Sequence, residues 1–298
     1  MHLDGFIILA GAIVGFAVGL TGMGGGALMT PVLVLLLHVQ PGAAVSSDLV
    51  ASFFMKPVGG VVHLRKGTVH LRLAGWLVAG AAPAAFAGAA LLHLVASGKA
   101  LQHDIKLGLG AALLVAVGGI VLRSLTRSRT SVPATPEGQW PPVRRLSTLA
   151  VGLVGGLIVG MTSVGSGSLM IVALMFLYPG LTGGQLVGTD LVQSVPLVGA
   201  AALGQLLFGN VELAVTTSLL IGSLPAVYLG ARLSAGAPTR FVRPAIAVIL
   251  LVSALKLVDV SNAVLLGSLL GAVVVAVGAA PLSRWARRGD REAAITTG

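Results

Sequence analysis

Of the 298 residues of this chain, 56% are hydrophobic and only 9% are charged, and the mean hydropathy is +1.00. A soluble globular domain carries about 25% charged residues, so this composition excludes one and predicts a chain surrounded by lipid. The net charge of +10 does not predict a nucleic-acid partner, because the basic residues form short clusters between apolar spans, where they set membrane orientation.

Chemical groups on which most enzymes and metal proteins rely are scarce. The absence of cysteine excludes disulfides, thiolate metal sites and cysteine catalysis. No two histidines form a convincing metal pair, and we find no nucleophile elbow or phosphate-binding loop, so we expect no enzyme, metal or cofactor. Residues 1–4 lack the positive charge of a signal peptide, and we expect the first apolar stretch to belong to the mature fold.

Apolar spans that suit membrane helices, or parts of them, follow one another along the chain. They cover 5–20, 25–38, 44–63, 72–95 and 104–122 in the first half, and 148–161, 166–178, 185–207, 213–231, 244–258 and 262–281 in the second.

The two halves are copies of each other. A shift of about 142 residues aligns Asp48 with Asp190, and the same offset, within one residue, matches a serine, several glycines and a proline. These pairs are Ser52 with Ser194, Gly19 with Gly160, Gly80 with Gly222, Pro83 with Pro225 and Gly88 with Gly230. We therefore divide the chain into membrane repeat 1 (1–123), a cytoplasmic linker (124–147), membrane repeat 2 (148–258), an extra transmembrane helix (259–281) and a basic cytoplasmic tail (282–298).

The distribution of Lys and Arg predicts that the repeats have opposite membrane orientation. Loop 64–72 contains three basic residues, whereas its counterpart at 208–212 contains none and includes Glu212. Conversely, loop 231–243 contains three arginines. Because cytoplasmic loops are enriched in Lys and Arg, we expect the N-terminus outside and the C-terminus inside.

Inversion requires that the first part of each repeat enters and leaves the membrane on one side. The arms 148–161 and 166–178 are short for full crossings, so we predict a re-entrant helical hairpin broken at 162–168, and an equivalent hairpin broken at 21–26. The predicted fold is thus all-α and polytopic. Each of its two inverted-topology repeats contains one re-entrant hairpin and three transmembrane helices, and one extra C-terminal helix follows.

Both breaks are rich in glycine and hydroxyl groups. Each break starts a new half-helix, whose free N–H groups and partial positive charge attract anions. Two such tips meeting near the membrane midplane would form one substrate site. Its predicted members are Thr21, Gly22, Gly24, Gly25, Gly26, Thr162, Ser163, Gly165, Ser166, Gly167 and Ser168. The alternative is that the glycines only permit close helix packing.

Charged residues within the spans are further candidates. Lys56 lies mid-span, where a charge is costly and indicates a function. Asp48, Ser52 and Lys56 share one helical face, so Lys56 would meet an anion, or else pair with Asp48 or snorkel. Ser194 joins the site as the repeat mate of Ser52. Asp48 and Asp190 would carry a coupling H⁺ or Na⁺, or would cap a helix start.

The segment from Gly15 to Gly26 reads GFAVGLTGMGGG and is followed by Pro31. This motif, its second copy at 156–167 and the Gly-Asn turn after residue 208 resemble the TauE/SafE family of sulfite exporters, also described as toluene-sulfonate uptake permeases. The resemblance covers about 8–270. It implies movement of a sulfur-containing anion, such as sulfite or an organosulfonate, coupled to an ion gradient. The second copy differs by having Ser163 and Ser166 where the first has Gly22 and Gly25.

The combined expectation is a secondary transporter of the bacterial cytoplasmic membrane that works by alternating access. Its partners would be the anion, the lipid bilayer and, in a homo-oligomer, further copies of the chain. A passive anion channel is one alternative, distinguished by a flux that ignores ion gradients. A non-transporting scaffold is another, and it would tolerate Gly24→Ala or Gly165→Ala.

Because the chain has no native cysteine, single introduced cysteines report topology without background. We expect Asn210→Cys to react with a membrane-impermeant thiol reagent added outside, and Lys66→Cys to react only from inside. Labelling of both positions from the same side would contradict the inverted repeat.

Overall fold

The computed structural model describes residues 4–21, 25–95, 98–126, 140–167, 169–209, 211–233, 251 and 253–257. Within these ranges all regular secondary structure is helical, which confirms the all-α prediction. The helices are α1 (Gly5–Thr21), α2 (Gly26–Leu35), α3 (Pro41–Arg65), α4 (Leu71–Val95), α5 (Gly98–Thr126), α6 (Arg145–Thr162), α7 (Leu169–Leu177), α8 (Gly183–Phe208) and α9 (Leu213–Leu233). The predicted extra helix at 259–281, the tail and most of the linker lie outside the described residues.

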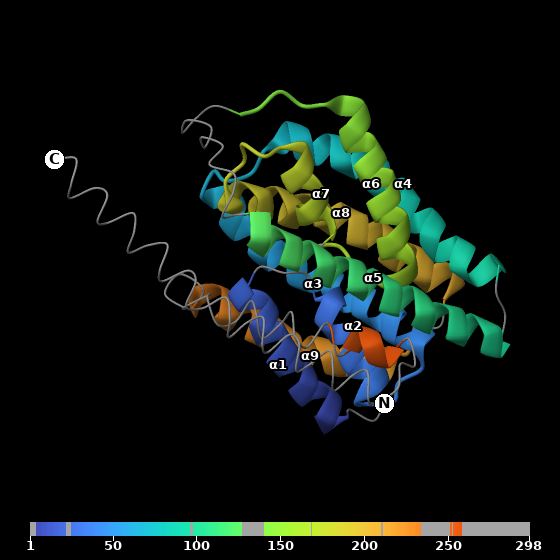
Figure 1. Cartoon of the computed structure of the whole chain (residues 1–298). Coiled ribbons are helices and arrows are strands. Elements are labelled where there is room, and N and C mark those ends of the chain that lie inside the picture. Colours follow the sequence, from blue (N-terminus) through green and yellow to red (C-terminus); the bar gives the residue numbers. More distant parts are fainter. Residues whose placement is uncertain are drawn as a thin grey trace.

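Helices α3 and α8 cross in the middle of the molecule (Figure 1). Pro41 occupies the first turn of α3, where its missing N–H costs nothing, and Thr182 forms a capping box with Gln185 at the start of α8. The two helices run antiparallel, because Ser46 near the start of α3 contacts Gln205 near the end of α8, whereas Gly59 near the end of α3 lies against Leu191 in the first half of α8. These helices carry the candidate charged residues.

The long arm of each hairpin packs against a helix of the other repeat. In Figure 1, α1 lies beside α9 and α6 lies beside α4, and these two contacts are the most extensive between helices. Leu77, Ala81 and Ala85 of α4 meet Gly152, Gly156 and Gly160 of α6 in that order. The two helices are therefore parallel and their backbones touch, as small residues allow.

The α1–α9 contact repeats this design. A Cβ atom built on Gly15 would lie 2.8 Å from the Cα atom of Ser223, and one on Gly222 would clash with the Ile8 carbonyl. Gly222 and Gly80 are repeat mates, and both press against the other repeat. Several of the repeated glycines therefore allow close packing between helices.

Five helices in the described part of the chain are long and apolar enough to cross a membrane: α3, α4, α6, α8 and α9. The inclusion of α6 corrects the prediction of two short arms in the second hairpin, since its 18 residues extend about 27 Å, close to the thickness of the hydrocarbon core. Its partner α7 has only nine residues.

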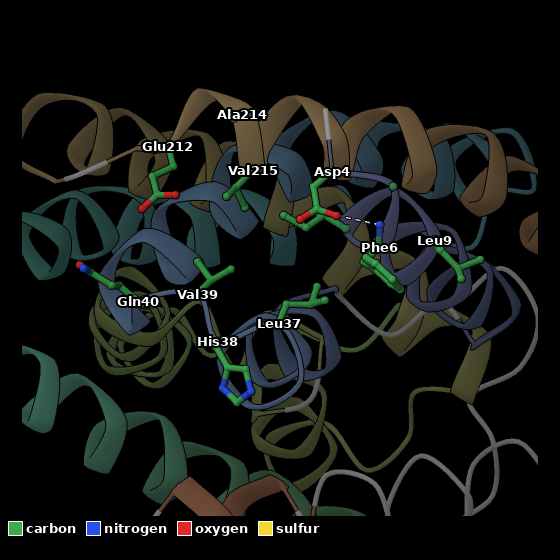
Figure 2. Close-up of a pocket in the computed structure, with 12 residues that line it drawn as sticks. Asp4, Phe6, Leu9, Leu37, His38, Val39, Gln40, Glu212, Ala214 and Val215 are labelled. Carbon is green, nitrogen blue, oxygen red and sulfur yellow. Dashed lines mark hydrogen bonds between the residues drawn. The ribbon is translucent and has the colours of Figure 1, made fainter. Parts of the chain in front are cut away.

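Each hairpin begins and ends at the same pole of the molecule. Asp4, His38 and Glu212 line one cavity of about 880 Å³, so the start of α1 and the end of α2 lie together (Figure 2). At the opposite pole the Tyr178 hydroxyl, just after α7, accepts a 2.8 Å hydrogen bond from the backbone N–H of Arg144, just before α6. This geometry is consistent with re-entrant hairpins from opposite sides. Which pole faces the cytoplasm stays a prediction.

We expect Gly156→Ala to lower the melting midpoint of the detergent-purified protein, because an added methyl group meets the backbone of Ala81 and overpacking costs about 1–3 kcal/mol. The matched control is Gly75→Ala on α4, where the new methyl group meets no atom within 4 Å and helix propensity improves. Equal midpoints for the two variants would contradict tight α4–α6 packing.

Candidate functional site

One buried polar face of α3 forms the floor of the candidate site. Asp48, Ser52 and Lys56 succeed one another at four-residue intervals, as predicted, and are 0%, 2% and 4% exposed. Hydroxyl groups from both hairpins converge on this face.

The first break leads into α2, whose start rests on the α3 face. A Cβ atom on Gly25 would lie 3.2 Å from the Ser52 hydroxyl and 3.1 Å from the Met55 methyl carbon. One turn further along, the Thr30 hydroxyl donates a 2.7 Å hydrogen bond to the Asp48 carboxylate. The preceding residues of this predicted motif, Gly22 and Gly24, lie outside the described residues, as does the Thr21 side chain.

The second break spans the residues between α6 and α7. The backbone turns through left-handed conformations at Ser163 (φ 58°), Gly165 (φ 118°) and Gly167 (φ 126°). Glycine adopts such angles without steric cost, which explains its spacing here. The Ser163 hydroxyl donates a 2.7 Å hydrogen bond to Asp48, the same carboxylate that Thr30 contacts. Ser168 falls outside the described part of this segment.

Lys56 binds the second break directly. Its ammonium donates to the Ser166 hydroxyl at 2.6 Å and to the Ser166 carbonyl at 3.3 Å. The second break is thus fastened to α3 at two points eight residues apart, with Ser163 on Asp48 and Ser166 on Lys56.

The two breaks touch each other. A Cβ atom on Gly26 would clash with the Ser163 carbonyl oxygen, so only glycine permits this approach. The structure therefore brings together Gly25 and Gly26 of repeat 1 with Ser163 and Ser166 of repeat 2, over the α3 face. We call this arrangement the tip cluster.

Other predicted residues lie apart from these polar contacts. The Ser194 hydroxyl donates to the Leu191 carbonyl within α8, and the Thr162 hydroxyl donates to the Ile158 carbonyl within α6. Asp190 accepts a 2.9 Å hydrogen bond from the Gln193 amide on its own helix. Neither aspartate caps a helix, because each is the eighth residue of α3 or α8, which corrects the capping alternative.

Two of the hydroxyl groups expected to contact an anion, those of Ser52 and Ser163, instead contact Asp48. Thr30, Ser163 and Ser52 all donate to its carboxylate, the last at 3.3 Å. Thr30 was not predicted, although a hydroxyl four residues after Gly26 in an apolar arm was a usable signal. Lys56 acts electrostatically on both Asp48 and Asp190, so one ammonium and two carboxyl groups share the buried centre.

A second polar network, also missed by the sequence, surrounds Gln205. Its side-chain carbonyl accepts from the Ser46 hydroxyl and lies 2.9 Å from the His93 ring nitrogen Nε2. Its amide donates to the Gly160 carbonyl at 3.1 Å. This network joins α3, α4, α6 and α8. A glutamine within the predicted span 185–207 was its only sequence signal.

These features define a multi-pass helical membrane protein of the transporter class, with a polar centre built from broken helices. The chain belongs to the sulfite exporter TauE/SafE family, whose model matches residues 7–257. The family is one of membrane transporters rather than enzymes. The resemblance read from the glycine-rich motifs is thus confirmed.

Curated relatives carry transporter names. The chain is 38% identical over 253 residues to the probable membrane transporter protein YjnA of Bacillus subtilis (strain 168), covering 85% of this chain and 98% of that protein. It is 26% identical over 254 residues to the probable membrane transporter protein YdhB of the same strain, covering 82% and 98%. A probable membrane transporter protein of Xylella fastidiosa (strain 9a5c) is 30% identical over 168 residues, 56% of this chain and 60% of that protein. No solved structure matches.

Proposed function

We propose that this chain is a secondary transporter that moves a small sulfur-containing anion, sulfite or an organosulfonate, by alternating access around the tip cluster. The observation that carries the proposal is the buried Lys56 ammonium, held by Ser166 at the break of the second hairpin. A buried charge is expensive, and membrane proteins retain one where it serves a substrate or ion pathway.

Lys56 and the second break supply what an oxyanion needs. An ammonium has three N–H donors, and α7 begins at Leu169, directly after the break, so its first turn places a partial positive charge beside the break. The Ser166 hydroxyl can rotate to donate to an oxyanion once Lys56 turns toward that ligand. The proposed anion would therefore displace the Lys56–Ser166 contact rather than the hydroxyls on Asp48.

Alternating access is supported by where the hairpins begin. They enter from opposite poles and meet at the tip cluster, where the polar residues of the cluster and of the α3 face below it are only 0–5% exposed. Such a centre is closed to both poles, which favours a transporter over a passive channel with a continuous passage. To open the centre toward one pole, one hairpin would have to move away from it together with its packing partner in the other repeat. The first hairpin would move with α9, and the second with α4.

The proposed orientation has the N-terminus outside and the protein in a bacterial cytoplasmic membrane. The cavity lined by Asp4, His38 and Glu212 would then face outward. Its two carboxylates do not favour an anion, so we place the substrate at the tip cluster and not in this cavity.

We expect sulfite, or a sulfonate such as sulfoacetate, to raise the melting temperature of the detergent-purified protein in a concentration-dependent way, while chloride does not. Lys56→Met should weaken this binding at least about tenfold, equivalent to about 1.4 kcal/mol. The control Lys66→Met removes the same charge from the exposed loop after α3 and should bind as the wild type does. Unchanged affinity in Lys56→Met would reject the tip cluster as the anion site.

A further inference from the structure

Asp190 is a buried carboxyl group that the anion site does not use. It is 1% exposed, and its Oδ2 atom has no hydrogen-bond partner among the described residues. Next to it on α8, the Gln193 side chain is fully buried and its Oε1 atom is also without a partner. Buried polar side-chain atoms usually have a hydrogen-bond partner, so two unpartnered oxygens one helical turn apart need an explanation.

The contrast with its repeat mate shows that Asp190 has a different role. Asp48 accepts hydrogen bonds from three hydroxyls, whereas Asp190 accepts one, from the Gln193 amide. The positions that correspond to the Asp48 donors Thr30 and Ser163 are Ile171 and Gly22. Ser194, the repeat mate of the third donor Ser52, donates to the Leu191 carbonyl instead. Repeat 2 has therefore kept the carboxyl group at this position but not the three hydroxyl contacts that hold Asp48.

Three titratable residues other than Asp48 act on Asp190 or contact the residues just before it on α8. Lys56 of α3 acts on it electrostatically. The His63 ring lies against Gly188, with Nδ1 3.0 Å from a Cβ built there, and His70 donates its backbone N–H to the Thr189 hydroxyl at 3.0 Å. The His63 and His70 rings have other partners, the Thr68 hydroxyl and the Pro141 carbonyl. A Cβ atom built on Gly59, three residues after Lys56, would lie 3.3 Å from the side chain of Leu191, the residue after Asp190. Lys56 therefore belongs to the stretch of α3 that packs beside Asp190 and serves as its counter-charge, which Asp48 shares.

Gln193 can serve Asp190 in both protonation states. Its NH₂ group donates to the Oδ1 atom of Asp190 at 2.9 Å. When Oδ2 carries a proton, Oδ1 is the carbonyl oxygen of the neutral carboxyl group, and it still accepts a hydrogen bond from the same NH₂ group.

We propose that Asp190 is the coupling site of the transporter and takes up one proton when an anion binds at the tip cluster. This inference rests on the proposed function. An arriving anion turns Lys56 toward itself and leaves Asp190 without its counter-charge. One proton from the solvent then bonds to Oδ2, while no other bond forms or breaks. A monoanion and a proton together leave the net charge of the buried centre unchanged.

The proton site is tested first without any anion, by infrared spectroscopy of the full chain as a function of pH. We expect a carbonyl band of a protonated carboxyl group on the acidic side. It should disappear in Asp190→Asn and persist in Glu212→Gln, which removes an exposed carboxylate at one pole. Gln193→Leu should keep the band to more alkaline pH, because the carboxylate loses its one donor. A band that none of these changes affects would overturn the proposal.

The coupling is tested with ethanesulfonate, which stays ionised throughout. We expect about one proton taken up per anion bound, measured with a pH dye in weak buffer, and no uptake in Asp190→Asn although ethanesulfonate still raises its melting temperature. Binding without proton uptake in the wild type, or transport driven by Na⁺ and unaffected by Asp190→Asn, would overturn the coupling and leave the anion site standing. No binding of any anion, with the Asp190 band present, would reject the proposed substrate and retain the proton site.

Discussion

The arrangement of the polar centre depends on the Asp48 carboxylate, which gathers hydroxyl donors from three separate elements. Thr30 comes from α2, Ser163 from the second break and Ser52 from α3 itself. Hydrogen bonds to a charged group contribute about 1.5–3 kcal/mol each, and in a buried setting the loss of one leaves a charge partly unsatisfied. Asp48 thus holds both hairpins to the central helix, and it does so with donors that would otherwise face an anion. This leaves Lys56 and Ser166 as the polar pair free to exchange partners.

The scaffold is symmetric, whereas its chemistry is not. Repeat-related glycines place α1 against α9 and α6 against α4 in the same way. Within this frame Lys56 is matched by Val198, and Ser163 by Gly22. Because the repeat is duplicated, the chain has two hairpins, each packed against the other repeat, and in the proposed mechanism they move alternately. Because the two copies differ in sequence, they share a single charged centre, and either movement would open it.

Much of the fold could be predicted because a membrane limits the secondary structure that an apolar span can adopt. Each apolar span through residue 233 became a helix, and the glycine-rich breaks fell where the repeat placed them. Length was less predictable, since α6 continues to 18 residues through a stretch expected to be a short arm. The sequence places Asp48, Ser52 and Lys56 on one face because helical period is local. It could not reveal that Thr30 and Ser163 meet at Asp48, because that contact joins residues 115 positions apart and depends on tertiary packing.

The central claim is that an anion binds where the two hairpin breaks meet over Lys56. The most direct measurement is a structure of the detergent-purified protein with selenite, a heavier analogue of sulfite whose selenium can be located by anomalous scattering. We predict selenium within reach of the Lys56 ammonium and the Ser166 hydroxyl, with the Lys56–Ser166 hydrogen bond exchanged for contacts to the anion. Selenium only in the cavity near Asp4 and Glu212, with the tip cluster unchanged, would contradict this account.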